Sequence, residues 1–206
     1  MNQFLQNGLL CAGLGLAVLA SGCASKVTYV DPSSNEGIAT VGNVDTQDWG
    51  KAATDAINSL LKTDVLDRTD GRRSVIMIST IKNGTNEHID TDLLTKKIRV
   101  ALNESGKVYT TTAVGVKGPE DEASMGVRDL RTSKEFDQST VQQQGQLKAP
   151  DFSLSGKIIE QRASAGSTKQ SAFAFQLSLT NLKTGLAEWE KEVMIIKQGK
   201  KAGLGW

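Results

Sequence analysis

The last third of the chain carries the pattern that most constrains its fold. Apolar and polar residues alternate there along three consecutive stretches, and a run of turn-forming residues from Asn181 to Gly185 separates the last two. The apolar positions are Phe152, Leu154, Gly156 and Ile158, then Phe173, Phe175, Leu177 and Leu179, and finally Trp189, Val193 and Ile195. Successive side chains of a strand point to opposite sides, so this period of two is typical of strands with one buried face. The C-terminal third is therefore predicted to be an antiparallel meander.

Two segments upstream show the spacing of amphipathic helices instead. Apolar residues recur three or four apart at Trp49, Ala52, Ala53, Ala56, Ile57, Leu60 and Leu61, and again at Leu94, Ile98, Ala101 and Leu102. This spacing places each set on one side of a helix. Asp45 or Thr46 is expected to cap the first helix and Asp90 the second. Gly106 is expected to end the second helix.

Two further strands complete the predicted domain. The run from Ser74 to Ile81 is rich in β-branched residues and suits a central strand, and Lys107 to Val114 is predicted to be another. Residues 119–147 have the least regular pattern, and Met125, Val127 and Leu130 are expected to face the core from a short helix there. The order of elements predicts an α/β fold, in which helices pack on one face of a mostly antiparallel sheet.

The N-terminus has the features of a lipoprotein signal peptide. An uncharged apolar stretch, too short to span a membrane as a helix, leads into Leu19-Ala20-Ser21-Gly22-Cys23. Small residues before a cysteine are what cleavage and lipidation of the thiol require. We therefore expect a signal peptide over residues 1–22, a lipid on Cys23 and a tether over residues 23–45, with a plain secretory signal as the alternative. By similarity to bacterial lipoproteins, Ala24 after the cysteine predicts the periplasmic face of the outer membrane.

Residues 46–206 are predicted to form one globular domain with a short basic C-terminal tail. The composition of the whole chain argues against several functions. Its 24 Lys and Arg against 23 Asp and Glu give a net charge of +1, whereas nucleic-acid-binding proteins usually have a basic excess. His88 is the one histidine, and of the two cysteines Cys11 leaves with the signal peptide while Cys23 carries lipid. We therefore predict a protein that is not an enzyme and that binds no metal, no cofactor, no nucleic acid and no small-molecule substrate.

The most distinctive polar segment lies between the central strand and the second helix. Residues 86–92 gather three carboxylates and the histidine. The spacing fits neither a zinc protease, which needs two histidines four apart, nor a calcium loop. It suits a loop whose side chains bond its own backbone and cap the next helix. A protein-binding loop is the alternative interpretation. Farther along, Arg162 and Lys169 are either solvated charges or a steering patch, and Phe173 is either a core or a contact residue.

Three sequence segments together point to a family. They are K-N-G-T-N-E-H-I-D-T at 82–91, F-Q-L-S-L-T-N-L-K-T-G at 175–185 and E-W-E-K at 188–191. They resemble the LpoB family, outer-membrane lipoproteins that activate a class A penicillin-binding protein, over roughly residues 48–200. The resemblance implies an α/β domain similar to the N-terminal domain of TolB. It also implies a lipoprotein that reaches inward and binds a small regulatory domain of a peptidoglycan synthase in the inner membrane, which stimulates glycan polymerisation and cross-linking.

The sequence thus predicts a lipoprotein that binds and allosterically activates a class A penicillin-binding protein. The loop and the later hairpin are the expected contact surface. Its candidate residues are Asn83, Thr85, Asn86, Glu87, His88, Arg162, Lys169 and Phe173. The L-x-T-G-x-x-x-W pattern at 182–189 is shared with TolB-like and CsgG-like domains. A structural subunit of an outer-membrane assembly is therefore the alternative function.

Overall fold

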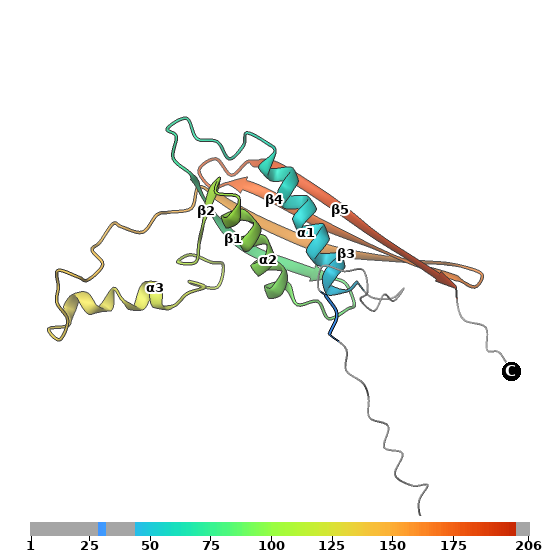
Figure 1. The fold of residues 1–206 in the computed structure, drawn as a ribbon, viewed down its shortest axis with the longest axis horizontal. Helices are drawn as coiled ribbons and strands as arrows, with labels where there is room; N and C mark the ends of the chain where they lie inside the picture. Colours follow the sequence, from blue (N-terminus) through green and yellow to red (C-terminus); the bar gives the residue numbers. More distant parts are fainter. Residues whose placement is uncertain (1–28, 32–43, 201–206) are drawn as a thin grey trace, which may run out of the picture. The chain divides into compact units, whose positions relative to one another are not determined.

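The computed structural model of the chain describes residues 29–31 and 44–200 (Figure 1). The domain discussed below lies within the unit Gly37–Trp206. The predicted signal peptide, the lipidation site Cys23, most of the tether and the end of the basic tail lie outside the described residues. Within residues 29–31 and 44–200, no helix is long and apolar enough to cross a membrane.

The elements follow the predicted order. They are α1 (Thr46–Leu61), β1 (Ser74–Gly84), α2 (Thr91–Glu104), β2 (Val108–Thr111), α3 (Ala123–Gly126), the 3-10 helix η1 (Asp129–Thr132), β3 (Phe152–Ala165), β4 (Thr168–Asn181) and β5 (Ala187–Lys200). Of the two candidate caps for α1, the structure selects Asp45, whose carboxylate accepts the N–H groups of Gln47 and Asp48 at 2.9 Å. Asp48 in turn accepts the N–H of Asp45 at 3.2 Å, which completes a capping box. Asp90 caps α2 as predicted.

The five strands form one sheet in the order β2-β1-β3-β4-β5. The long strands β3, β4 and β5 pair antiparallel, as the alternating pattern predicts. Strand β1, however, pairs parallel with both β2 and β3, so the sheet is mixed. The parallel pairs follow from the connections, because α2 links β1 to β2 and a long segment links β2 to β3, and such crossovers bring strands back in the same direction.

Strand β1 extends beyond its predicted end. Residues Lys82 to Gly84, expected in the polar loop, pair with Lys157 to Ile159 of β3. The register shifts between Ile78 and Ile81, so both side chains face the core although they lie three residues apart. A bulge of this kind turns the strand by one residue and restores burial. Strand β2 is shorter than the predicted strand and ends at Thr111.

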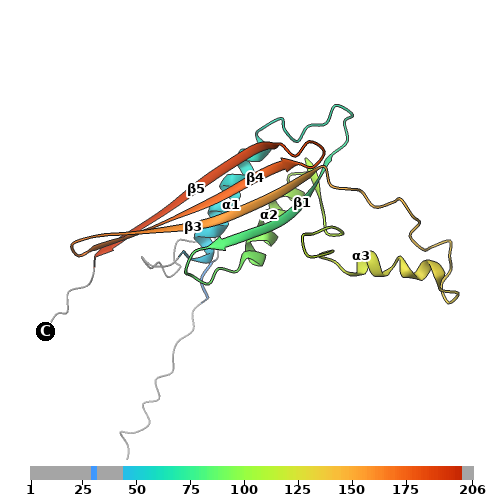
Figure 2. The ribbon, with the colours of Figure 1, turned by 180° about the vertical axis from the view of Figure 1, so that it is seen from behind.

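Helices α1 and α2 pack on one face of the sheet (Figure 1), and no helix within residues 44–200 covers the opposite face (Figure 2). Trp49 of α1 meets the rings of Phe173 and Phe175 edge-on, with centroids 6.2 Å apart in both pairs. Both phenylalanines are fully buried. The apolar side chains of β4 and those of α1 therefore pack in a single core.

The connection between β2 and β3 does not follow its prediction. Met125 and Val127 are exposed, not turned toward the core, and α3 contacts η1 away from the sheet (Figures 1 and 2). The start of this segment is held by Arg99 of α2, a buried side chain whose guanidinium makes two hydrogen bonds to the Glu120 carboxylate. A charged pair, in place of apolar packing, therefore ties the connection to the helical layer.

Candidate partner-binding surface

The loop after β1 is organised by its own side chains. The Asn83 amide oxygen accepts the N–H of Thr85 at 3.0 Å and its hydroxyl at 2.8 Å, and the Asn83 amide nitrogen donates to the Glu87 carbonyl at 2.8 Å. The Glu87 N–H donates to the Thr85 hydroxyl at 3.1 Å. The prediction of a loop that bonds its own backbone and then caps a helix at Asp90 is confirmed. Asn86 and His88, which take no part in these bonds, are exposed.

An ion-pair cluster joins this loop to the hairpin of β3 and β4. The Arg162 guanidinium lies 2.5 Å from the Glu87 carboxylate and also bonds the Glu160 carboxylate. The Asn86 N–H adds a long hydrogen bond of 3.5 Å to Glu160. Bonds to Glu160 and then to Glu87 raise the pKa of Arg162 above its ordinary value. Two segments that lie 75 residues apart in the sequence are thus held together at one end of the sheet.

The remaining candidate residues divide between surface and core. Lys169 is exposed near the tip of the hairpin and pairs across it with Ser164. Phe173 is fully buried against Trp49, so its inclusion in the contact surface is wrong and the core alternative is confirmed. The reason is register, because Phe173 lies opposite Glu160 on the face that the helices cover.

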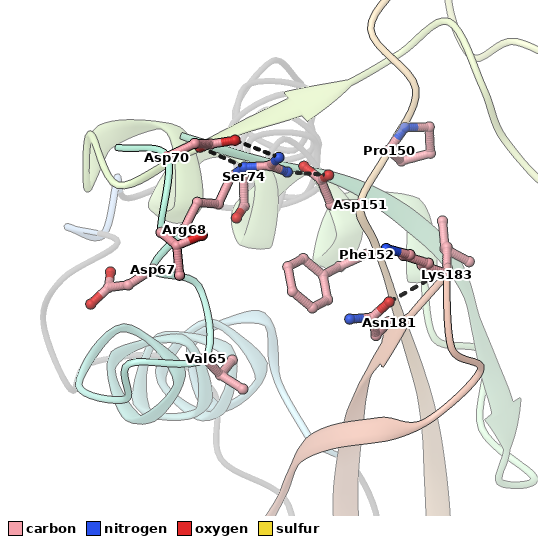
Figure 3. Close-up of a pocket in the computed structure, with 12 residues that line it drawn as sticks. Val65, Asp67, Arg68, Asp70, Ser74, Pro150, Asp151, Phe152, Asn181 and Lys183 are labelled. Atoms are coloured by element: carbon pink, nitrogen blue, oxygen red, sulfur yellow. Dashed lines mark hydrogen bonds and ion pairs between the residues drawn. The ribbon is translucent and has the colours of Figure 1, made fainter. Parts of the chain in front are cut away.

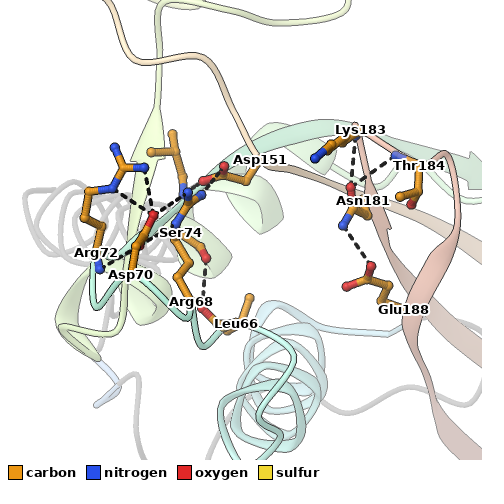
Figure 4. Close-up of polar contacts among 11 residues, drawn as sticks. Leu66, Arg68, Asp70, Arg72, Ser74, Asp151, Asn181, Lys183, Thr184 and Glu188 are labelled. Carbon is orange, nitrogen blue, oxygen red and sulfur yellow. Dashed lines mark hydrogen bonds and ion pairs between the residues drawn. The ribbon is translucent and has the colours of Figure 1, made fainter.

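A second polar cluster lies at the opposite end of the sheet, where β1 and β3 begin. It lines an open groove of about 530 Å³ (Figure 3). The Arg68 guanidinium bonds both Asp70 and Asp151, and Asp151 also accepts the Val75 N–H at 2.9 Å (Figure 4). Arg72 completes the cluster at 2.7 Å from Asp70. These charges neutralise one another and fasten the loop before β1 to the start of β3, so the cluster acts as a structural clamp. In the part of the chain that the structure describes, no group of three or more His, Cys, Asp or Glu could hold a metal ion.

The clamp predicts a dependence of stability on acid. Hydrogen bonds from Arg68 and then Arg72 hold the pKa of the Asp70 carboxyl well below its usual range. A lowered folded-state pKa stabilises the fold above the ordinary aspartate pKa of about 3.9, and this stability is lost as the pH falls below that value. We expect thermal unfolding of Asp70→Asn to depend less on pH than the wild type between about pH 2 and 5. Parallel pH profiles for the two proteins would contradict this role.

The sequence was compared with those of known protein families. The profile described as "Peptidoglycan-synthase activator LpoB" matches residues 48–195. The chain belongs to the LpoB family. The resemblance expected from the three sequence segments is therefore confirmed, and with it membership of a family of peptidoglycan-synthase activators.

Solved structures are also similar to this LpoB-family chain. The LpoB C-terminal domain from Salmonella enterica is 18% identical, with a TM-score of 0.42, over 72% of this chain and 98% of that domain. The LpoB C-terminal domain from Escherichia coli is 17% identical, with a TM-score of 0.43 and the same coverage. Lipoprotein GNA1162 from Neisseria meningitidis is 10% identical, with a TM-score of 0.36, over 64% of this chain and 89% of its own. A comparison with curated protein sequences finds no match.

One member of the ion-pair cluster in this LpoB-family domain was missed by the sequence reasoning. The Glu160 side chain is only 4% exposed, and it holds Arg162 in place. A signal for it does exist in the sequence. Glu160 follows Phe152, Leu154, Gly156 and Ile158 in the apolar phase of its strand. A carboxylate in that phase needs a cation or several donors, since an unpaired buried charge is costly.

Proposed function

We propose that this chain is an outer-membrane lipoprotein, anchored through Cys23, that binds and allosterically activates a class A penicillin-binding protein. The observation that carries the proposal is the match of the LpoB family over residues 48–195, which includes the candidate loop and hairpin. The protein acts without chemistry of its own. It binds the active conformation of the synthase more tightly than the resting one and so shifts the population toward activity.

The proposed contact surface is composite, formed by the loop at 85–88 and the neighbouring hairpin strand. The cluster of Glu87, Glu160 and Arg162 supports this assignment, because it fixes the loop against β3 and so preorganises the surface. Preorganised surfaces bind more tightly, since less conformational freedom is lost on association. Asn83 and Thr85 shape the loop, and the Asn86 N–H bonds Glu160 of the hairpin. His88 and Lys169 add exposed polar groups on either side.

The test is an activation assay. The chain without residues 1–22, carrying Cys23→Ser so that no lipid is attached, is added to class A synthases one at a time. Glycan polymerisation is followed from lipid-linked precursor. Allosteric couplings of about 1–3 kcal/mol change an affinity by about 5- to 150-fold, so a clear stimulation of one synthase is expected. A folded chain that stimulates none, and that instead assembles into rings, would assign it to the structural alternative.

A charge reversal tests the loop directly. Glu87→Lys places an ammonium beside Arg162 and should weaken synthase binding about 10-fold, which corresponds to about 1.4 kcal/mol. Glu104→Lys is the matched control, because it makes the same charge change at an exposed site at the far end of α2. Affinity is measured by titration calorimetry, with circular dichroism to check folding. Equal affinities for the two variants would remove the loop from the contact surface.

A further inference from the structure

A small apolar pocket lies beside the contact loop, where α2 begins. Its volume is about 190 Å³, and its walls include Trp49, Ile89, Leu93 and Leu94. An engineered apolar cavity of about 150 Å³ is large enough to bind benzene. The pocket therefore has room for one aromatic or large aliphatic side chain. His88 lies in its wall and also in the contact loop, so the pocket is continuous with the proposed contact surface.

The pocket wall also contains a cationic side chain, Lys97, without an ion-pair partner in the described residues. Lys97 is half-buried in its wall and makes no ion pair or hydrogen bond with the other residues of 29–31 and 44–200. Its ammonium lies against the backbone of α1, since a Cβ added to Gly50 would be 2.8 Å from the Lys97 nitrogen. The carboxylate in the wall, Asp90, is already engaged as the cap of α2. A lysine side chain that is half-buried in an apolar wall and has no ion-pair partner is a site for an incoming carboxylate.

We propose that this pocket is the anchor site for the synthase. A segment of the partner inserts one large apolar side chain between α1 and α2 and places a neighbouring carboxylate on Lys97. This inference rests on the proposed function and names the chemistry that the partner presents. Interfaces concentrate their binding energy in apolar side chains seated in pockets. Arg162 is already engaged by Glu87 and Glu160, so the ion-pair cluster shapes the surface while the pocket supplies affinity.

A matched pair of substitutions on α2 tests the proposal. Leu93 and Val100 are both apolar residues of α2, 44% and 42% exposed, but only Leu93 lines the pocket. We expect Leu93→Asp to weaken binding of the periplasmic part of the synthase at least 10-fold, and Val100→Asp to change it less than twofold. Lys97→Glu should also weaken binding about 10-fold, because it would repel the partner's carboxylate. Affinities come from titration calorimetry on proteins shown to be folded, and Leu93→Ser replaces Leu93→Asp if that variant is unstable.

The outcomes separate this inference from the proposed function. If the wild type activates a synthase and Leu93→Asp binds it equally well, the pocket is not the anchor and the proposed function stands. If no synthase binds the wild type, both fall. Analytical ultracentrifugation of the chain alone tests whether a second copy of the chain occupies the pocket instead. A wild-type dimer that Leu93→Asp abolishes would assign the pocket to a second copy and overturn the inference.

Discussion

Replacing Phe173 with alanine is expected to cost the domain about 3–5 kcal/mol of unfolding free energy, the usual loss for a buried aromatic side chain. Phe173 is fully buried and packs edge-on against Trp49, so its removal leaves a cavity between α1 and β4 that the backbone cannot fill. In a domain of this size the loss corresponds to a fall in Tm of roughly 6–20 °C. Urea unfolding followed by far-ultraviolet circular dichroism measures it.

The exposed neighbour on the same strand provides the control. Lys169→Ala should change stability by less than about 0.5 kcal/mol, as surface substitutions usually do. Phe173→Leu keeps most of the buried volume, so we expect it to retain both fold and synthase binding. A Phe173→Ala variant of normal stability that fails to bind the synthase would show instead that the side chain reaches a partner.

Removing the cation of the ion-pair cluster is expected to have the second largest effect. Arg162→Leu leaves the Glu160 carboxylate, only 4% exposed, without its cation. A buried acceptor left unsatisfied costs about 1–3 kcal/mol, and water reaching the half-exposed position of Arg162 should keep the loss near the lower end. Loss of the bond to Glu87 also frees the loop, so amide hydrogen exchange should accelerate at residues 85–88.

A double-mutant cycle isolates the cause of this loss. Glu160→Gln added to Arg162→Leu removes the buried charge, so the double variant should be more stable than Arg162→Leu alone. Lys169→Leu likewise replaces a cationic side chain with leucine elsewhere on the hairpin and should have little effect. Additive losses in the double variant would mean that Glu160 and Arg162 contribute independently and do not form a coupled cluster.

Both predictions concern how the contact surface is built. Phe173 supports the surface from the core, because it packs β4 against α1. Arg162 lies at the surface and holds the loop against β3. The two variants should therefore differ in which property changes most. Phe173→Ala should lower global stability, and Arg162→Leu should mainly raise local exchange and weaken binding of the partner.

The sequence by itself determined most of the local structure. The period of two in β3 and β4, the helical spacing from Trp49 to Leu61 and the caps at Asp45 and Asp90 are signals carried by neighbouring residues. Such signals act within a few residues of the chain, so they could be recognised without the fold. The three family segments were equally local, and the family match confirms them.

Only the tertiary structure decided what depends on residues far apart in the chain. It paired β1 in parallel with β3, turned Phe173 into the core, left Met125 exposed and brought Arg162 to Glu87. Strand register and the position of a long crossover are set by packing across the whole sheet, which no local pattern specifies. Lys97 became a candidate site for the same reason, because its missing partner is visible only once α1 lies beside α2.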